Sequence, residues 1–324
     1  MIKNSIFFGI VQNDLTALEA ELLSIIHSPV HLITEISEHL VQAGGKRLRP
    51  ALYFLSARCG CDDQAKLQPL ATAIELIHMA TLVHDDVIDN AATRRGIPTA
   101  NNKWGNQMSV LIGDYLFAKA FSIVASSQVS GRVMQVLTEV ICSMSEGEII
   151  QNQDIFNPEQ HEMEYLSRIA KKTADFIAAS CELGALTAGL PEAYVQALRD
   201  YGYSIGMAFQ ITDDILDITA SSEQLGKPAG NDLRQGIVTL PVLYALKHSP
   251  AAAELRTIVA TCNMTEAELA RGLQIIHETD AVEYSYKLVG EYLNRARILL
   301  PAAVPPDIRE AFLAVAEFIE MRNF

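Results

Sequence analysis

The sequence has few of the features that mark secreted and nucleotide-binding proteins. It contains five cysteines in 324 residues, an odd number with no C-x-x-C pair, which fits a chain kept reduced in the cytoplasm. It lacks a G-x-x-x-x-G-K-[ST] loop, a G-x-G-x-x-G fingerprint and a Ser-His-Asp pattern, which argues against P-loop phosphoryl transfer, nicotinamide chemistry and acyl transfer. We expect neither a secretory signal nor an apolar run long enough to span a bilayer.

Positive charge is also scarce. The chain has 25 Lys and Arg residues against 39 Asp and Glu residues, which gives a formal net charge of -14. Because there is no basic stripe that could release counterions from a phosphate backbone, we expect no nucleic-acid partner. The basic residues form small local clusters instead, which suits recognition of small anions.

Strand-like alternation of β-branched residues is hard to find, although 49% of the residues are hydrophobic. This composition predicts an all-α chain. The candidate linkers are short turn segments, and no shift in composition marks a boundary between them. We therefore expect one helical domain over residues 1–324.

What the chain does contain is a pair of acidic pentads, Asp85-Asp86-Val87-Ile88-Asp89 and Asp213-Asp214-Ile215-Leu216-Asp217. Residues four apart share one face of a helix, so the first and last aspartate of each pentad project together. A single pentad is about as often an exposed acidic helix end. Two pentads, each following an apolar stretch, favour neutralisation by a hard cation, because unpaired buried like charges are costly. Mg²⁺ prefers such oxygen ligands and takes substrate phosphates as well.

Basic residues gather near both pentads. Arg94 and Arg95 follow the first pentad, and Lys46 and Arg49 follow a Gly-Gly turn. Further single candidates are His78, Lys172, Thr173, Gln210 and Lys227. Each of these alone is more often an ordinary core or surface residue. Carboxylates would repel a diphosphate by roughly 4 kcal/mol per contact at about 4 Å, so two polyanions in one pocket require metal ions as well as these cations.

The ordered motifs resemble those of the trans-isoprenyl diphosphate synthases over roughly residues 40 to 245. The segments that carry the resemblance are Gly44–Pro50, the first pentad with Arg94-Arg95-Gly96, Gly113–Leu116, Lys172–Ala174 and Phe209–Asp214. Within that family, Gly226–Leu233 and Val238–Leu246 look most similar to the catalytic second component of bacterial heptaprenyl diphosphate synthases. One position departs from the commoner pattern, because Ile237 stands where many relatives carry lysine.

The resemblance implies an all-α bundle of the isoprenoid synthase type around a deep central cavity. It implies Mg²⁺-dependent, head-to-tail (1'-4) condensation of isopentenyl diphosphate onto an allylic diphosphate such as farnesyl diphosphate, with a site of about three ions. The implied metal ligands are Asp85, Asp89 and Asp213, and the wider catalytic group adds Asp86, Asp214 and Lys172. The implied contacts of the allylic diphosphate are Arg94, Lys172, Gln210 and Lys227, and those of isopentenyl diphosphate are Lys46, Arg49, His78 and Arg95. Thr173 is a further substrate-binding candidate.

The resemblance also bears on product and partners. Ala80 and Thr81, small residues just before Asp85, would leave a long tunnel for the growing chain, which favours a heptaprenyl product for a quinone such as menaquinone. The alternative is that they only permit close helix packing. We expect a dimer, with a heterodimer containing a smaller non-catalytic subunit and a transient membrane-surface association both open. Rival functions are a shorter-chain homodimeric synthase making geranylgeranyl or farnesyl diphosphate, a terpene cyclase and a non-catalytic helical regulatory subunit.

Overall fold

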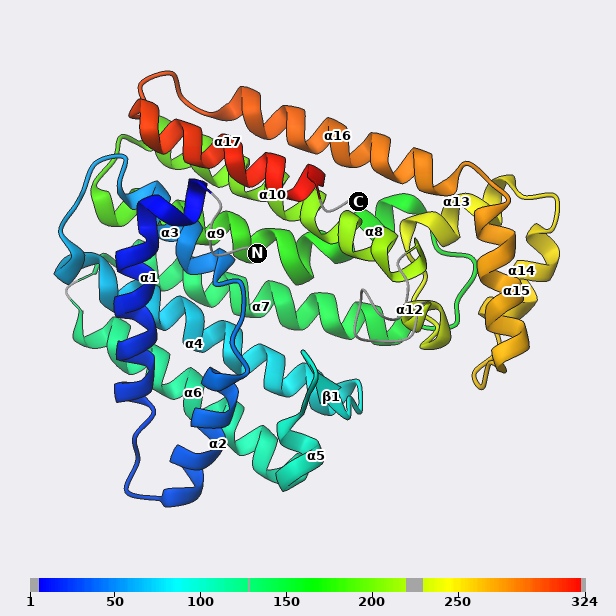
Figure 1. Ribbon diagram of the computed structural model, residues 1–324, viewed down its shortest axis with the longest axis horizontal. Helices are drawn as coiled ribbons and strands as arrows, with labels where there is room; N and C mark the ends of the chain where they lie inside the picture. The colour runs from blue at the N-terminus through cyan, green and yellow to red at the C-terminus, as the bar shows by residue number, and fades with distance from the viewer. Residues whose placement is uncertain (1–5, 128, 220–229, 322–324) are drawn as a thin grey trace. The chain divides into compact units, whose positions relative to one another are not determined.

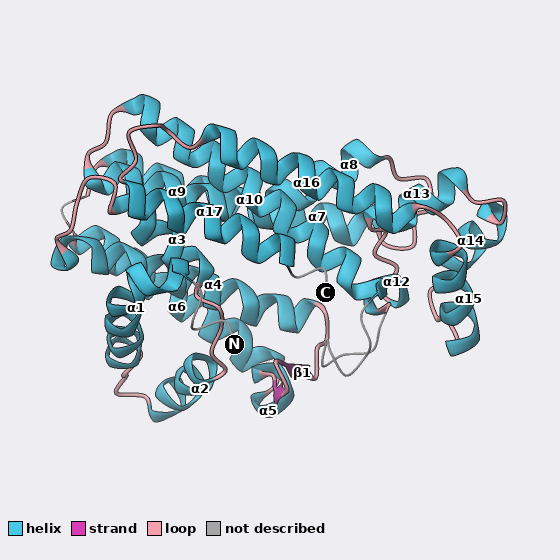
Figure 2. Cartoon of the chain, turned by 45° about the horizontal axis from the view of Figure 1, so that its top comes forward, coloured by secondary structure: helices cyan, strands magenta, loops and turns pink. Residues whose placement is uncertain are grey.

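The computed structural model describes residues 6–127, 129–219 and 230–321, and helices dominate in this part of the chain (Figure 2). The only strands within these ranges are β1 (Thr93–Arg94) and β2 (Ile97–Pro98), which pair as a short antiparallel hairpin. The hairpin is a local turn and forms no layer of its own. The all-α expectation is confirmed.

The chain divides into two compact units. Unit 1 comprises Met1–Val136, Ser180–Gln196 and Ala303–Phe312, and unit 2 comprises Leu137–Ala179, Ala197–Ala302 and Leu313–Phe324. Each unit is assembled from separate stretches of sequence, so neither corresponds to one continuous segment. A single domain over residues 1–324 stays a prediction.

Unit 1 is built around helix α4. The helices that lie wholly in this unit are α1 (Ile6–Ile25), α2 (His31–Gln42), α3 (Leu48–Ala57), α4 (Gln64–Ile88), α5 (Ala100–Trp104) and α6 (Asn106–Ser126), most of them labelled in Figure 1. α4 packs along α6, and α1 and α3 pack on α4. Every residue of α3 except Arg49 is buried, so α3 is a core helix that carries one cation in its first turn.

Unit 2 contains a second set of packed helices. Those wholly inside it are α8 (Glu162–Ile169), a π-helical turn (Ala170–Ala174), α12 (Asn231–Arg234), α13 (Leu240–His248), α14 (Ala252–Val259), α15 (Glu266–His277) and α16 (Ala281–Leu299). The helices that contribute residues to both units are α7 (Gly131–Asp154), α9 (Asp175–Ala188), α10 (Glu192–Thr219) and α17 (Pro306–Glu320). α13 packs on α16 and α14, and α14 packs on α15.

Helix α6 departs from one expectation. By length and composition it could cross a membrane, with a mean hydropathy of 1.5 over its most apolar window, and it is the one described helix that passes this test. The expectation that no apolar run is long enough is wrong for this helix. Inside unit 1, α6 packs on α4 and α5 and buries Ile112, Leu116 and Ala120. Packing within the unit therefore explains part of its apolar character.

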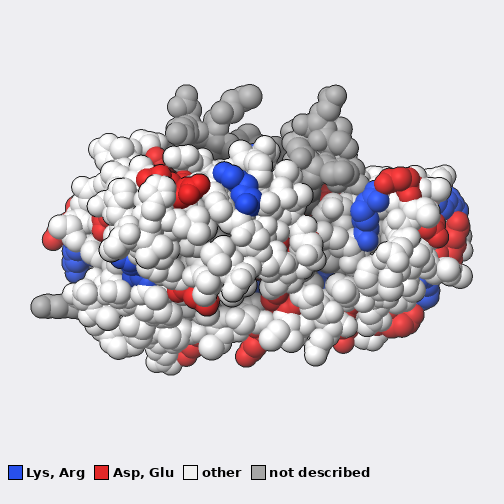
Figure 3. All heavy atoms as spheres, turned by 90° about the horizontal axis from the view of Figure 1, so that it is seen from below, with Lys and Arg blue, Asp and Glu red and all other residues white. Residues whose placement is uncertain are grey.

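The surface and the cysteines agree with the composition. On the face shown in Figure 3, the Lys and Arg side chains of the described residues lie in small separate groups and form no continuous stripe. All five cysteines lie in the described part of the chain and are free thiols. The absence of a nucleic-acid partner and the reducing compartment stay predictions.

Candidate active site

The first acidic pentad ends helix α4. The helix runs to Ile88, and Asp89 caps it by donating its N–H to the carbonyl oxygen of Asp85 at 2.8 Å. Asp85 is half-buried and Asp89 is exposed. The two residues are one helical turn apart and share a face. The pair of carboxylates that the sequence predicted is therefore present at this helix end.

Asp86 lies between them but is buried, with 3% of its surface exposed. Its Oδ1 accepts a hydrogen bond from Nε of Arg94 at 2.7 Å. Burial raises the pKa of Asp86, and the positive charge of Arg94 opposes that shift. In this structure Asp86 anchors Arg94, and a direct catalytic role for Asp86 stays a prediction.

The β1–β2 hairpin sets the directions of Arg94 and Arg95. Arg94 pairs with Ile97, which leaves Arg95 and Gly96 as a two-residue loop. Both loop residues have positive φ, 54° for Arg95 and 80° for Gly96, as a type I′ turn requires. The hairpin thereby directs Arg94 onto Asp86 and leaves Arg95 to a different neighbour.

That neighbour is the Gly44–Gly45 turn, which precedes α3. Gly44 has a φ of 66°, and Arg47, the N-cap of α3, has a φ of 49°. A Cβ added to Gly45 would lie 2.7 Å from Nη1 of Arg95, closer than real Cβ atoms approach. Glycine thus lets the backbone lie against the guanidinium, and a larger residue would displace the end of the Arg95 side chain. Two basic segments that are distant in the sequence meet at this point.

Arg49 and His78 extend the same cluster. Nη1 of Arg49 lies 3.2 Å from Nε2 of His78. Burial lowers the pKa of Arg49 to about 10, and the negative charges of Glu75 and Asp85 oppose the shift. Burial and the surrounding arginines lower the pKa of His78 well below its usual value, so the imidazole is neutral and its Nε2 accepts from Arg49. Arg49, His78 and Arg95 are thus brought together as the sequence predicted, and half-buried Lys46 lies in the adjoining turn.

The second pentad lies on α10, and its three aspartates differ in how deeply they are buried. Asp213 is half-buried, whereas Asp214 and Asp217 have only 4% and 1% of their surfaces exposed. Oδ2 of Asp217 accepts a hydrogen bond from the N–H of Asp232 at 3.0 Å, in the first turn of α12. Asp217 is therefore engaged inside unit 2, although its spacing had placed it beside Asp213 as a second carboxylate for a cation.

Asp214 is held by neutral donors. Its Oδ2 accepts from the hydroxyl of Tyr165 at 2.7 Å, and its Oδ1 accepts from Nε2 of Gln210 at 2.8 Å. Oε1 of Gln210 accepts in turn from the hydroxyl of Thr173 at 2.8 Å. Burial raises the pKa of Asp214 to about 6, and the two hydrogen bonds oppose the shift. Thr173, Gln210 and Asp214, all of them predicted, thus form one hydrogen-bonded chain that ends on Tyr165.

Lys172 and Thr173 lie in the π-helical turn between α8 and α9. Nζ of Lys172 is 2.6 Å from Oε2 of Glu148 on α7. Glycines let the neighbouring helices approach this turn: a Cβ on Gly147 would lie 3.1 Å from the backbone nitrogen of Lys172, and one on Gly206 would lie 2.6 Å from Cα of Ala174. Single π-helical turns are frequent at functional sites because they displace the residues within an otherwise regular helix.

Comparisons with known proteins connect this arrangement to one family. The model of the polyprenyl synthetase family matches residues 30–276. The chain belongs to this family. It is 45% identical to heptaprenyl diphosphate synthase component 2 of Geobacillus stearothermophilus, with 100% of both chains covered. It is 40% identical to the protein of the same name from Bacillus subtilis (strain 168), covering 100% of this chain and 92% of the relative.

Solved structures of polyprenyl synthetases agree. The heptaprenyl diphosphate synthase of Staphylococcus aureus matches with a TM-score of 0.91 and 35% identity, over 97% of this chain and 99% of that one. The polyprenyl synthase of Caulobacter crescentus CB15, described as complexed with calcium and isoprenyl diphosphate, matches with a TM-score of 0.91 and 36% identity, over 98% and 97% of the two chains. The predicted family and the isoprenoid synthase fold are confirmed, and the chain is a prenyltransferase.

The carboxylates of this polyprenyl synthetase fit Mg²⁺. Among the described residues, no three or more His, Cys, Asp or Glu side chains converge into a closed metal cage. Asp85 and Asp89 instead offer hard oxygen ligands at an accessible helix end. Mg²⁺ usually takes one or two carboxylates and fills its other positions with water and substrate phosphates. The donor set therefore suits a magnesium ion that is completed by a diphosphate.

Four other positions singled out in the sequence have different outcomes. Lys227 lies outside the described residues. Ala80 is fully buried on α4, whereas Thr81 is half-exposed and donates its hydroxyl to the carbonyl oxygen of His78 at 2.8 Å. Ile237 donates its backbone N–H to the carbonyl oxygen of Asp232 at 2.9 Å. Thr81, one turn before Asp85, is thus the more accessible of the two chain-length candidates.

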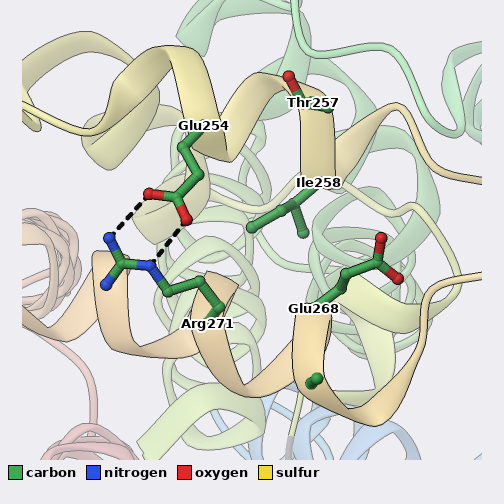
Figure 4. Close-up of a pocket in the computed structure, with 6 residues that line it drawn as sticks. Glu254, Thr257, Ile258, Glu268 and Arg271 are labelled. Carbon is green, nitrogen blue, oxygen red and sulfur yellow. Dashed lines mark hydrogen bonds and ion pairs between the residues drawn. The ribbon is translucent and has the colours of Figure 1, made fainter.

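A separate pocket of about 360 Å³ lies between α14 and α15 (Figure 4). Its polar groups are engaged with one another: Nε and Nη2 of Arg271 donate to the two carboxylate oxygens of Glu254 at 2.9 and 2.7 Å. Glu268 accepts from the backbone and hydroxyl of Thr265 at the start of α15. None of the predicted site residues lines this pocket, and we assign it no part in catalysis.

Several residues of the two clusters were given no individual role from the sequence. They are Arg47, Glu75, Glu148 and Tyr165. Glu75 could have been noticed, because it is a lone charge within the apolar stretch that precedes the first pentad. Tyr165 and Glu148 carry no such signal, since their importance depends on which helices pack against them.

Proposed function

We propose that this polyprenyl synthetase condenses isopentenyl diphosphate head-to-tail (1'-4) onto an allylic diphosphate such as farnesyl diphosphate. The proposed product is heptaprenyl diphosphate, which would supply the side chain of a quinone such as menaquinone. The names of the Geobacillus stearothermophilus and Bacillus subtilis relatives and of the Staphylococcus aureus structure support a product of this length. The proposal places the enzyme in the cytoplasm, with transient contact with a membrane surface for product release.

The observation that carries the proposal is the convergence of Arg49, His78 and Arg95 near the first pentad. A diphosphate is a compact polyanion, and guanidinium groups bind its oxygens through charge-assisted hydrogen bonds. We assign isopentenyl diphosphate to this cluster together with Lys46. The neutral His78 keeps Arg49 oriented without adding another positive charge.

We assign the allylic diphosphate to the acidic residues through Mg²⁺, with Asp85, Asp89 and Asp213 as protein ligands and about three ions in the site. The metal would neutralise the leaving diphosphate and so favour cleavage of the allylic C–O bond. The proposed direct contacts are Arg94, Lys172, Thr173, Gln210 and Lys227. Asp86 and Asp214 support this group by holding Arg94 and Gln210 in place.

The bond changes require little from the protein besides charge and orientation. The allylic C–O bond breaks and its electron pair leaves on the diphosphate. The double bond of isopentenyl diphosphate then attacks the allylic carbon, and a proton is lost to form the new double bond. We propose that the released diphosphate accepts this proton, which removes the need for a protein base.

The proposed long product depends on the apolar face of α4. A growing chain would leave the metal site past Thr81 and Ala80 and extend into the deep cavity expected for this fold. Because neither side chain is large, neither would stop the chain early. This role for Ala80 and Thr81 is a proposal based on their size and position on α4.

We further propose that the chain works in a heterodimer with a smaller, non-catalytic subunit. The support is the word "component" in the names of the two relatives that cover the whole chain. The partner would be required for efficient synthesis of the long product. A homodimer with a shorter product is the alternative.

One experiment tests these proposals. The purified chain, alone and co-expressed with a candidate small subunit, is given labelled isopentenyl diphosphate, farnesyl diphosphate and Mg²⁺, and the products are separated by chromatography. We expect heptaprenyl diphosphate from the assembly, weak synthesis by the chain alone and none with a chelator. Absence of labelled product from every preparation would overturn the enzymatic function. Full long-chain synthesis by a homodimer would overturn only the partner requirement.

A further inference from the structure

A buried ion pair joins the segment Lys46–Arg49, at the start of α3, to the middle of α4. Glu75 has 2% of its surface exposed, and Arg47 has 7%. Nη1 of Arg47 donates a hydrogen bond to Oε1 of Glu75. Neither of these two residues contacts a substrate in the reaction proposed above.

Stability alone does not account for this pair. Removing two charges from water costs about as much as their attraction returns, and replacing a buried pair with apolar side chains is often neutral or stabilising. Ile74 and Leu76, which adjoin Glu75 in the sequence, are apolar and fully buried, so this carboxylate lies in a part of α4 that belongs to the core. A carboxylate here therefore calls for a role in the neighbouring site.

Glu75 and Asp86 act as two anchors on one side of α4. They are separated by about three helical turns, and both line a small cavity together with Met79 and Val83. The cavity is also lined by Gly44 and by arginines of both basic segments. The two carboxylates are thus placed along the same wall of the basic cluster.

Each anchor holds the arginine that precedes a diphosphate ligand. Glu75 binds Arg47, two residues before Arg49, and Asp86 binds Arg94, directly before Arg95. Fixing Arg47 also fixes the backbone around it, because Arg47 adopts the left-handed conformation, with φ 49° and ψ 35°, at the N-cap of α3. The orientation of the turn is therefore linked to the carboxylate of Glu75.

The negative charge of Glu75 also acts on Arg49 and Arg95. Burial lowers the pKa values of Arg49 and Arg95, and the negative charge of Glu75 opposes the shift in both. The positive charges of Arg47 and Arg94 act in the opposite direction on Arg95. Crowded guanidinium groups repel one another, so a buried anion among them lowers the cost of holding them close.

We infer that Glu75 is a positioning residue for the isopentenyl diphosphate site. Through Arg47 it fixes the segment Lys46–Arg49 at the start of α3, and its charge keeps Arg49 and Arg95 together before the substrate arrives. This inference rests on the proposed function and adds to it a determinant of affinity that lies behind the residues in contact with the substrate.

The test is Glu75→Gln, measured in the assembly that supports condensation. Because a displacement of about 1 Å can cost about 100-fold in rate, we expect KM for isopentenyl diphosphate to rise roughly 10-fold or more. KM for the allylic substrate should stay within about 2-fold, since the metal ligands are untouched. Calorimetric titration with isopentenyl diphosphate in the presence of a chelator should show the same loss, because only fixed cations bind it there.

The matched control is Asp14→Asn. Asp14 is another buried carboxylate of unit 1, 1% exposed, which accepts from Nε and Nη2 of Arg58 at 3.0 and 2.7 Å. Its loss should lower the melting temperature and leave both KM values unchanged. If Glu75→Gln does not fold, the double variant Glu75→Leu with Arg47→Met serves instead, because apolar replacement of both partners preserves stability. The double variant should fold, and its affinity for isopentenyl diphosphate should be reduced as in Glu75→Gln.

The outcomes separate this inference from the proposed function. Normal affinity for isopentenyl diphosphate in a folded Glu75→Gln variant or in the double variant would overturn the inference alone. An equal rise in both KM values, or a matching rise in Asp14→Asn, would also overturn it by showing general loosening of unit 1. Failure of the parent protein to condense the substrates would overturn the proposed function and the inference with it.

Discussion

The two acidic pentads have the same aspartate spacing, yet the structure uses them differently. In the first, the buried middle aspartate, Asp86, is paired with the cation of Arg94. In the second, the buried Asp214 is held by the neutral groups of Tyr165 and Gln210, and burial raises its pKa to about 6. The largest compensation for burial is the charge of Arg94 at Asp86 and the hydrogen bonds of Tyr165 and Gln210 at Asp214.

The last aspartates differ as well. Asp89 is exposed at the end of α4, whereas Asp217 is 1% exposed and caps the first turn of α12. The first pentad can therefore offer two carboxylates to metal ions, and the second offers chiefly Asp213. Equal spacing along a helix fixes which residues share a face, but what packs on that face decides whether they bind a ligand or stabilise the fold.

The largest loss of activity is expected from removing the metal ligand that each pentad supplies. Asp85→Ala and Asp213→Ala should each lower kcat by about 10² to 10³, because each removes a ligand where charge develops in the transition state. Their melting temperatures should match the parent's, and a chelator should abolish parental activity until Mg²⁺ is restored. Near-normal turnover by either variant would remove the metal-site argument for that pentad.

The next effect separates the substrates of the two regions. Lys46→Ala and Arg49→Ala should raise KM for isopentenyl diphosphate by about 10- to 100-fold, since hydrogen bonds to charged groups are worth about 1.5–3 kcal/mol. Lys172→Ala should act mainly on KM for the allylic diphosphate. Steady-state kinetics with each substrate varied in turn would show which of the two KM values each variant raises. Equal damage to both substrates by all three variants would show that the partition is wrong.

Product length should change when a large side chain is introduced on α4, but not when one is introduced on α10. Ala80→Phe should shorten the product by blocking the tunnel, with a loss of about 1–3 kcal/mol in stability from overpacking. The matched control is Ala208→Phe, because Ala208 stands five residues before Asp213 and is also fully buried. It should lose stability without shortening the product. Chromatography of the products, together with thermal melts, compares the two, and an unchanged length in a folded Ala80→Phe variant would place the tunnel floor elsewhere.

The smallest effect concerns the last aspartates. Asp217→Ala should lower the free energy of unfolding by about 1–2 kcal/mol, because the part-buried N–H of Asp232 loses its acceptor. Asp89→Ala should change it by about 0.5 kcal/mol or less, as is usual for exposed positions. Denaturant titrations without Mg²⁺ measure both values. A larger loss for Asp89→Ala than for Asp217→Ala would reverse the contrast between the pentads.

Much of the site could be predicted because it depends on short-range order. The apolar composition predicted helices, and the four-residue spacing placed Asp85 and Asp89 on one face. Residue type made the basic segments Lys46–Arg49 and Arg94–Arg95 candidates for anion binding, and the family resemblance assigned them to the two diphosphates. The same reasoning overlooked the length and apolar character of α6, because one aspartate and one lysine interrupt the sequence without outweighing its mean hydropathy.

By itself, the sequence determined the helical class, the chemistry of the ligands and the family. Only the tertiary structure decided which carboxylates are buried and what neutralises each of them. The contact between Gly45 and Arg95, the pairing of Arg47 with Glu75 and the engagement of Asp217 by α12 all join residues distant along the chain. Such pairings depend on which surfaces pack together, and burial in turn sets the cost of each charge and the partner it requires.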